Sequence, residues 1–389
     1  MNHTEVISGA ERSLLSLLGG LPADLAPLVA SPPGRLQQAV AELGVPTAAV
    51  AGTAGSLRLH PLHTPRALAE LSVAALQVRR LARRHRAEVV HANSIRAGIV
   101  LALARLEQAT VVHVRDCLPP GALSVATLRL IGASATSVIA NSRYTAESVR
   151  AMAPGARLEV LYNPVDLARF DPQRLDRRAA RAALGPAGAS GLLLGVVGQL
   201  SPWKGQDTAI EALALVRAQG LDAHLLVIGS AKFTARATRF DNRAYLEGLH
   251  RRAAAAGVAE HISWLGERED VPELVRALDA LLLPSWEEPF GRALIEAMAL
   301  EVPVIATNVG GPAEIVRDGR EGRLAPPREP GAWARAIVEL AAREDGGAAL
   351  GRAGRARVER EFTVQRHVAD TLAVYERALA RGPGARARS

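Results

Sequence analysis

Short apolar runs of the kind that form buried strands alternate along this chain with segments of helical periodicity, and the alternation occurs twice. In the first half, strands are predicted at 88–93, 109–116, 136–142 and 158–166, with helices at 95–107, 121–133 and 144–152. In the second half, strands are predicted at 192–200, 223–230, 261–266, 280–285 and 302–306, with helices at 206–219, 241–256 and 271–278. Strands that alternate with helices are joined by right-handed crossovers and build a parallel, doubly wound sheet. The sequence therefore predicts an α/β protein made of two doubly wound, Rossmann-like domains that face each other across a cleft.

The length of 389 residues fits two domains better than one core. We expect an N-terminal domain at 1–166 and a second domain at 190–363, with a helix at about 364–380 that packs back on the first. The longest apolar runs are shorter than the roughly 18 residues that a membrane span needs. A single cysteine, Cys117, cannot form an internal disulfide. Because no signal peptide opens the chain either, we expect a cytoplasmic protein.

The start of the chain departs from the alternating pattern. A turn at Ser8 and Gly9 leads into a helix at about 11–18, but no apolar strand precedes the turn. In a doubly wound sheet, a helix that follows such a turn is normally preceded by a strand. We therefore expect the first strand to be missing from these residues and the natural start to lie upstream.

The formal net charge is +8, and most of it lies in residues 1–165, which hold 16 arginines and 10 acidic residues. The end of the helix predicted at 65–86 carries a cluster of five: Arg79, Arg80, Arg83, Arg84 and Arg86. Cations are favourable at a helix C-terminus in any case, so the cluster is either a solvated face or a patch that contacts an anionic membrane. The second interpretation predicts peripheral association with the inner membrane face. With 3% aromatic residues and no recognisable nucleic-acid module, we expect no nucleic acid partner.

The segment from Pro284 to Asn308 carries the densest chemical signal. Glu288 precedes a turn at Gly291, a helix follows, and Glu296 lies eight positions after Glu288 inside that helix. A helix start presents backbone N–H groups and a positive dipole end to a phosphate, and carboxylates accept hydrogen bonds from ribose and sugar hydroxyls. The alternative is an ordinary loop and helix with solvated glutamates.

A lysine marks a second candidate position. The chain has 45 arginines and only two lysines, Lys204 and Lys232. Lys204 follows a predicted strand and precedes a glycine-led helix, where a compact point charge suits a diphosphate. The alternative is a simple turn residue.

In the first half, polar residues gather where the predicted strands end. They are found at 91–93, 113–116 and 141–143. Ligands of parallel sheets bind at the carboxyl ends of the strands, so these residues are candidates for binding a ligand.

These motifs together resemble a known family. VVGQLSPWKG, HISWLG and EEPFGRALIEAMALEVPVIATNVGGPAEIV, in this order, resemble the donor half of the family 4 glycosyltransferases, the retaining group with the GT-B fold. SGAERSLL, VVHAN, VIANSRYTAESV and LYNPVDL resemble its acceptor half.

The resemblance implies a role for each matching residue. Lys204 would hold the donor diphosphate, Glu296 the ribose and Glu288 the transferred sugar, while the amides of Phe290 and Gly291 would face the phosphate. The base would lie beside Leu265 and Gly266. The implied donor-binding set is Gly9, Gln199, Lys204, Gly205, Leu265, Gly266, Glu288, Phe290, Gly291, Arg292, Leu294 and Glu296. The implied catalytic set is Lys204, Glu288, Asp116 and Arg115, and the acceptor side is His91, Asn93 and Arg143.

Two positions differ from the family pattern. Gln199 stands where the family usually has arginine, and Arg292 or Arg143 is expected to compensate. Arg115 stands where the family often has histidine.

The resemblance implies transfer of a sugar from a nucleoside diphosphate sugar to a hydroxyl acceptor, with retention of configuration. Glycans, lipid-linked saccharides of cell-envelope polysaccharide biosynthesis and small metabolites are the expected acceptors. The chain has no D-x-D sequence, so we expect no metal site and no cofactor. A nucleotide-sugar epimerase and a non-catalytic nucleotide-sugar-binding protein are the alternatives.

Overall fold

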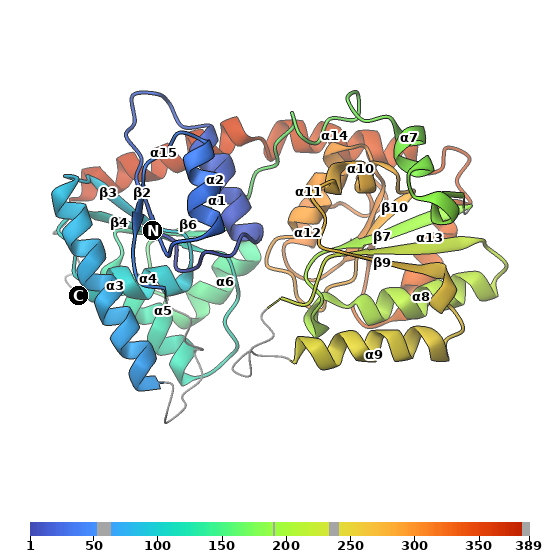
Figure 1. Ribbon diagram of the computed structural model, residues 1–389, viewed down its shortest axis with the longest axis horizontal. Helices are drawn as coiled ribbons and strands as arrows, with labels where there is room; N and C mark the ends of the chain where they lie inside the picture. Colours follow the sequence, from blue (N-terminus) through green and yellow to red (C-terminus); the bar gives the residue numbers. More distant parts are fainter. Residues whose placement is uncertain (53–63, 190, 233–240, 383–389) are drawn as a thin grey trace. The chain divides into compact units, whose positions relative to one another are not determined.

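The computed structural model describes the chain except for residues 53–63, 190, 233–240 and 383–389. The chain forms two compact units (Figure 1). Unit 1 combines Met1–Pro164 with Val364–Ser389, and unit 2 is Val165–Thr363.

Unit 1 contains a four-stranded parallel sheet in the order β3-β4-β5-β6. Its strands are β3 (Val89–Ala92), β4 (Ala109–Val114), β5 (Ser137–Ala140) and β6 (Leu158–Val160). A separate parallel pair is formed by β1 (Val29–Ser31) and β2 (Thr47–Ala49). The helices are α1 (Gly9–Gly19), α2 (Arg35–Glu42), α3 (Thr64–Arg84), α4 (Ile95–Ala104), α5 (Ala122–Ser134), α6 (Arg143–Met152) and α15 (Val364–Arg381).

Helices cover both faces of the four-stranded sheet. On one face α3, α4 and α5 share a core with the strands, and on the other α15 packs along β3 and β4 (Figure 1). Gly98 lets α4 approach β4 closely, because a Cβ atom at this position would lie 2.6 Å from Val112 Cγ1. On the opposite face Val374 and Ala378 of α15, one helical turn apart, are fully buried against Val111. The alternating apolar pattern thus produces the predicted doubly wound arrangement.

Met1 and Asn2 form hydrogen bonds with β1 and with the end of β3, although they do not form a strand. Met1 donates from its amino group to His91 O (2.5 Å) and accepts from Asn93 N (3.0 Å), both at the end of β3. Asn2 N donates to Ala30 O in β1 (2.8 Å). Met1 and Asn2 therefore lie between β1 and β3, in the position that a strand before α1 would take.

Unit 2 is built on a six-stranded parallel sheet in the order β12-β11-β10-β7-β8-β9. Its strands are β7 (Leu192–Val197), β8 (Ala223–Ile228), β9 (Ile262–Gly266), β10 (Ala280–Leu283), β11 (Val304–Thr307) and β12 (Arg323–Ala325). Its helices are α7 (Arg177–Ala182), α8 (Gln206–Ala218), α9 (Asn242–Ala255), α10 (Val271–Arg276), α11 (Arg292–Ala299), α12 (Pro312–Ile315), α13 (Pro330–Ala341) and α14 (Ala348–Glu361), with short 3-10 turns at Gly185–Ala189, Pro202–Lys204 and Ala259–His261.

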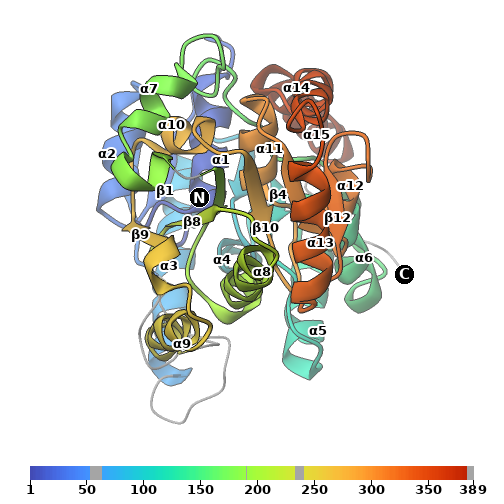
Figure 2. The same ribbon diagram turned by 90° about the vertical axis from the view of Figure 1, so that its right-hand side faces the viewer.

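The main core of unit 2 lies between the sheet and α8, α9 and α13. Helices α8 and α13 lie side by side (Figures 1 and 2). Trp333 of α13 is fully buried, and its indole N–H is satisfied by Pro326 O at 2.8 Å. Helices α10 and α11 lie on the other side of the sheet (Figure 1).

Two sequence expectations need correction. The strand expected at 158–166 ends at Val160, before Pro164, which has no N–H to donate to a sheet. The charged link expected at 167–190 contains helix α7 and belongs to unit 2.

Candidate active site

The topology of unit 2 creates a switch point between β7 and β10. From β7 the chain adds strands in one direction to β9, and from β10 it adds them in the other direction to β12. In sheets of this kind the loops after the two strands diverge at such a point, and ligands bind there, outside the carboxyl ends of the strands. Lys204 follows β7 and Glu288 follows β10. The fold thus brings together two of the predicted site residues.

Lys204 and Glu288 form a short ion pair at this point, with 2.6 Å between Nζ and Oε2. The side chains are only 18% and 7% exposed. Ser285 donates its hydroxyl to the same carboxylate oxygen at 2.9 Å, and the ammonium lies 4.0 Å from the ring centroid of Trp203. Because removal from water weakens screening, the charges interact more strongly than a surface pair would. Lys204 and Glu288 were both predicted as site residues from the sequence, but the contact between them was not.

Glycines hold the surrounding loops backbone against backbone. Gly205 has φ +69°, and a Cβ atom there would lie 2.0 Å from Pro284 O. Gly311 donates its N–H to Glu288 O (2.8 Å), and a Cβ atom at Gly311 would lie 2.5 Å from Phe290 Cα. The loop that carries Glu288 is therefore fixed from two sides. The Gly311 contact was not predicted from the sequence, although the Gly-Gly pair at 310–311 is a visible signal for it.

Helix α11 begins next to this loop. Its N-cap is Gly291 with φ +99°, so the first turn starts without a capping side chain. Arg292 donates to Glu296 at 2.9 Å along the helix, and these side chains are 15% and 12% exposed. The first turn of α11 and Glu296 together offer backbone donors and a carboxylate acceptor on one helix.

Two predicted donor-binding residues of this segment, Leu294 and Phe290, have buried side chains. Leu294 is fully buried and packs in the core, so its side chain is not available to a ligand. Phe290 is also buried, and its ring centroid lies 6.0 Å from that of Phe362 in an edge-to-face arrangement. At these positions only the backbone could face a phosphate.

The neighbouring strands β7, β8 and β9 end in glycines that approach one another. Gly229 donates its N–H to Gly266 O at 2.7 Å, and a Cβ atom at Gly229 would lie 1.9 Å from Gly198 O. Gly266 has φ +65°, and Leu265 is half-buried beside it. Gln199 turns its amide toward the backbone of Lys232, donating to Lys232 O at 3.3 Å. Because glycine has no side chain, these strand ends leave the backbone uncovered, which suits a flat ligand such as a nucleobase.

In unit 1, Arg115 is buried at the carboxyl end of β4. Its Nε and Nη2 donate to Asn93 Oδ1 at 3.2 and 2.9 Å, and its Nη1 donates to Asn163 Oδ1. Asn163 also accepts from Ser13 (3.3 Å), and Asn93 donates to Ala10 O (3.3 Å). Hydrogen bonds through Arg115 and Asn93 therefore connect α1 with the residues that follow β3 and β6. The Arg115 guanidinium is a positive charge held in place by the neutral amides of Asn93 and Asn163.

The other residues predicted for this unit lie nearer the surface. Asp116 is exposed, and its charge acts to raise the pKa of Arg96, which burial lowers overall. Arg143 is exposed at the first residue of α6, and Gly9 is exposed at the first residue of α1. Arg96 was not predicted as a site residue from the sequence.

A layer of histidines lies beneath these residues, between the sheet and α15. The ring centroid of His113 lies 5.7 Å from that of His91 and 6.4 Å from that of His367. His91 Nδ1 is 2.7 Å from the hydroxyl oxygen of Tyr375, and His91 Nε2 is buried. Burial, together with the charge of Arg115, holds the pKa of His91 and His113 well below the usual value. Both histidines are thus neutral in the folded protein near neutral pH.

This layer predicts acid sensitivity. Below pH about 6.5 the histidines of the unfolded chain gain protons, whereas the folded chain keeps His91 and His113 neutral. The unfolded state then binds more protons, so stability is expected to fall as pH decreases, by up to about 1.4 kcal/mol per pH unit for each histidine. Urea midpoints at pH 7.5 and 5.5 measure this loss. His113→Leu should show a smaller loss, and an equal loss in both proteins would contradict the interpretation.

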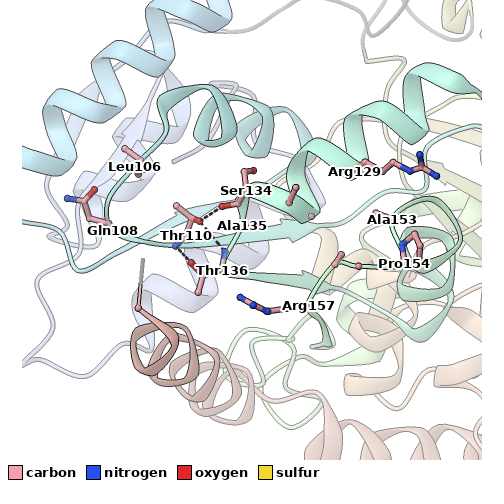
Figure 3. Close-up of a pocket in the computed structure, with 15 residues that line it drawn as sticks. Leu106, Gln108, Thr110, Arg129, Ser134, Ala135, Thr136, Ala153, Pro154 and Arg157 are labelled. Carbon is pink, nitrogen blue, oxygen red and sulfur yellow. Dashed lines mark hydrogen bonds between the residues drawn. The ribbon is translucent and has the colours of Figure 1, made fainter. Parts of the chain in front are cut away.

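A pocket of about 340 Å³ also opens in unit 1 (Figure 3). Its wall includes Thr110 and Thr136, which exchange hydrogen bonds between backbone N–H and hydroxyl groups at 3.1 and 3.2 Å. These residues lie at the amino ends of β4 and β5. The pocket is therefore at the opposite sheet edge from Arg115, and none of the predicted site residues lines it.

Among the described residues, no group of three or more His, Cys, Asp or Glu side chains is arranged to hold a metal ion. In the same part of the chain, no helix has both the length and the apolar character that crossing a membrane requires.

Both halves of the chain match models of known protein families. Residues 182–357 match the family model described as Glycosyl transferases group 1, and residues 7–169 match the one described as Glycosyltransferase Family 4. A protein of Mycolicibacterium gilvum named D-inositol 3-phosphate glycosyltransferase is 34% identical over 63% of this chain and 53% of its own length. A protein of the same name from Jonesia denitrificans is 32% identical over 69% of this chain and 64% of its own length. The chain spans about half to two thirds of the length of these curated relatives.

Solved structures resemble the chain over nearly its whole length. Anabaena Alr3699/HepE, in a crystal structure with UDP, has a TM-score of 0.79 and 27% identity, covering 96% of this chain and 98% of the other. The same Anabaena protein with UDP and glucose has a TM-score of 0.80 and 26% identity, covering 95% of this chain and 97% of the other. With both units matched by family models and the fold shared with HepE, the chain belongs to the family 4 glycosyltransferases of the GT-B fold.

Proposed function

We propose that this protein transfers a sugar from a nucleoside diphosphate sugar to a hydroxyl acceptor, with retention of anomeric configuration. The observation that carries the proposal is the Lys204–Glu288 pair at the switch point of unit 2, with the start of α11 and Glu296 following directly. Ligands of doubly wound sheets bind at this point, and the residue types there suit a phosphorylated sugar.

Each part of the donor has a matching group in unit 2. The diphosphate would lie between Lys204 and the first turn of α11, the ribose hydroxyls would donate to Glu296, and the sugar hydroxyls would donate to Glu288. The base would lie against the strand ends beside Gly266. Because HepE has been solved with UDP and with UDP-glucose, a uridine nucleotide is the first donor to test.

The reaction breaks the bond between the sugar C1 and the diphosphate oxygen and forms a bond from C1 to the acceptor oxygen. Negative charge develops on the departing diphosphate, and Lys204 together with the dipole of α11 would stabilise it. In a retaining transfer the acceptor attacks from the side that the leaving group vacates, and its proton moves to the departing phosphate. No metal is required in this scheme, so we propose that activity persists when divalent cations are chelated.

The acceptor is proposed from chemistry and from the relatives. The curated relatives are named for D-inositol 3-phosphate, so a phosphorylated polyol is the first acceptor to test. A saccharide used in cell-envelope polysaccharide synthesis, reached from the cytoplasmic side, is the second. Arg115 and Arg143 of unit 1 supply positive charge that fits an anionic acceptor.

Acceptor-dependent release of free nucleotide tests the proposal. With UDP-glucose as donor, release should be at least about tenfold faster when the correct acceptor is present, since transfer is coupled to departure of the nucleotide. Interconversion of donor sugars without an acceptor would indicate an epimerase. Tight donor binding with no turnover on any acceptor would indicate a non-catalytic binding protein.

We further propose that unit 1 associates with anionic membranes through one face of α3. This face exposes three apolar side chains, Leu68, Val73 and Leu76. On the same side of the helix, toward its end, stand Arg79, Arg80, Arg83 and Arg84. Exposed apolar side chains followed by arginines on one side of a helix suit insertion between anionic headgroups.

Vesicle cosedimentation tests the membrane proposal. Replacing Leu68, Val73 and Leu76 by serine should weaken binding to vesicles rich in anionic lipid by about tenfold or more, because their apolar area no longer enters the bilayer. Leu215→Ser, which alters an exposed leucine of α8 in unit 2, is the matched control and should bind like the unaltered protein. Equal binding by the triple variant, or equal binding to zwitterionic vesicles, would rule the proposal out.

A further inference from the structure

The cations beside the proposed donor site are already paired with carboxylates. Lys204 is paired with Glu288, and Arg292 is paired with Glu296. Each pair is mostly buried and adds no net charge. The diphosphate of a nucleoside diphosphate is an anion, and such charge binds well only where cations or backbone donors can meet it. Gln199, which follows β7 at the same edge of the sheet, is uncharged.

Lys232 lies next to that glutamine. It follows the end of β8, and its backbone oxygen accepts from Gln199 Nε2 at 3.3 Å and from Asn242 Nδ2 at 2.7 Å. Two side-chain amides therefore fix the position of Lys232 at the carboxyl edge of the sheet. Lys232 is also one of only two lysines among 47 basic residues, and the other is Lys204.

The Lys232–Glu267 ion pair is more exposed to solvent than the Lys204–Glu288 and Arg292–Glu296 pairs. Lys232 Nζ lies 2.6 Å from Oε1 of Glu267, the residue directly after β9, and the Glu267 side chain is 52% exposed. Exposed ion pairs contribute little to stability because water and salt screen them. Glu267 can therefore release Lys232 to an incoming anion more readily than Glu288 or Glu296 can release its cation.

We propose that Lys232 supplies a second cation for the donor diphosphate, in addition to Lys204. The inference rests on the proposed function of unit 2 and deepens it by assigning a further binding residue. When the nucleotide binds, the ammonium of Lys232 leaves Glu267 and contacts a phosphate oxygen. Arg292, which was expected to compensate, is engaged by Glu296, and Arg143 belongs to unit 1.

Calorimetry on the full chain with UDP, UMP and uridine tests this assignment. Lys232→Met should weaken UDP binding about tenfold or more, the loss expected for a charge-assisted contact. The same change should leave uridine binding within about twofold, because uridine has no phosphate. Lys232→Arg should restore most of the UDP affinity. Glu267→Gln should tighten UDP binding, because it removes the competing carboxylate.

The matched control is Arg268→Met, which removes a neighbouring exposed cation paired with Asp270 and should leave UDP affinity unchanged. If the unaltered protein binds UDP but Lys232→Met binds it equally well, the assignment to Lys232 is wrong while the proposed function stands. If Lys232→Met and Glu267→Gln weaken UDP and uridine alike, the pair has a structural role only, and the assignment is again wrong. If the unaltered protein binds none of UDP, GDP and ADP, the proposed function itself fails.

Discussion

Lys204→Met is expected to lower kcat/KM about 10²–10³-fold, the usual loss when a preorganised charge opposite a leaving group is removed. It should also destabilise the protein by about 3 kcal/mol, because Glu288 is left as a mostly buried carboxylate without its cation. Steady-state kinetics and urea unfolding measure the two effects separately. Both effects are expected to be large because Lys204 is at once the cation of the site and the partner of Glu288.

The double variant Lys204→Met with Glu288→Gln separates the two roles of the pair. Replacing the carboxylate by an amide removes the unpaired charge, so the double variant should regain most of the lost stability. It should not regain activity if Lys204 is the cation that meets the diphosphate, because that cation is still absent. Activity within about tenfold of the unaltered protein in the single variant would contradict the assigned role.

Gly311→Ala is expected to lower kcat/KM about 100-fold, the loss that a displacement of about 1 Å near a reacting centre can cause. The added methyl would lie 2.5 Å from Phe290 Cα and 2.6 Å from Pro289 O, both backbone atoms that cannot rotate away. The loop that carries Glu288 would therefore be displaced. Kinetics with saturating and limiting donor should show an increase in KM together with a decrease in kcat.

Gly331→Ala is the matched control for this glycine. Gly331 lies in the first turn of α13, and the nearest atom to an added methyl is the flexible end of Arg335 at 3.7 Å. Activity should be unchanged, and stability should rise slightly because alanine favours the helix. If Gly311→Ala and Gly331→Ala behave alike, the close packing between the two loops has no functional consequence.

The repeated alternation of apolar strands and helices was enough to predict both parallel sheets. Strands such as β4 and β8 are buried along their whole length, and burial of this kind leaves a continuous apolar run in the sequence. The short strands β1 and β12 were missed, since three residues carry too little pattern to distinguish them from a loop. Helix α2 was missed for a similar reason, because only Leu36 and Val40 of its eight residues are buried.

The sequence indicated which residues belong to the candidate site, but it did not indicate which of them contact one another. Glu288 and Glu296 stood out by their spacing around a glycine turn, and Lys204 stood out because lysine is so rare in this chain. The Lys204–Glu288 contact depends on β7 and β10 being neighbours, which strand order decides and local pattern does not. For the same reason, no local signal showed that Arg115 would be enclosed by Asn93 and Asn163.

The thermal stability of the full chain with and without UDP-glucose tests whether unit 2 binds a nucleoside diphosphate sugar through Glu296. A ligand at 100 times its Kd should stabilise the folded protein by roughly 2.7 kcal/mol, which a thermal-shift measurement detects. Glu296→Gln should bind the same donor about 10- to 100-fold more weakly, because the amide is a poorer acceptor for the ribose hydroxyls. A clear shift is expected for the unaltered protein, and a reduced shift is expected for Glu296→Gln at the same donor concentration. No shift with any of UDP-, GDP- and ADP-glucose, or the same shift in both proteins, would rule out the proposed donor site.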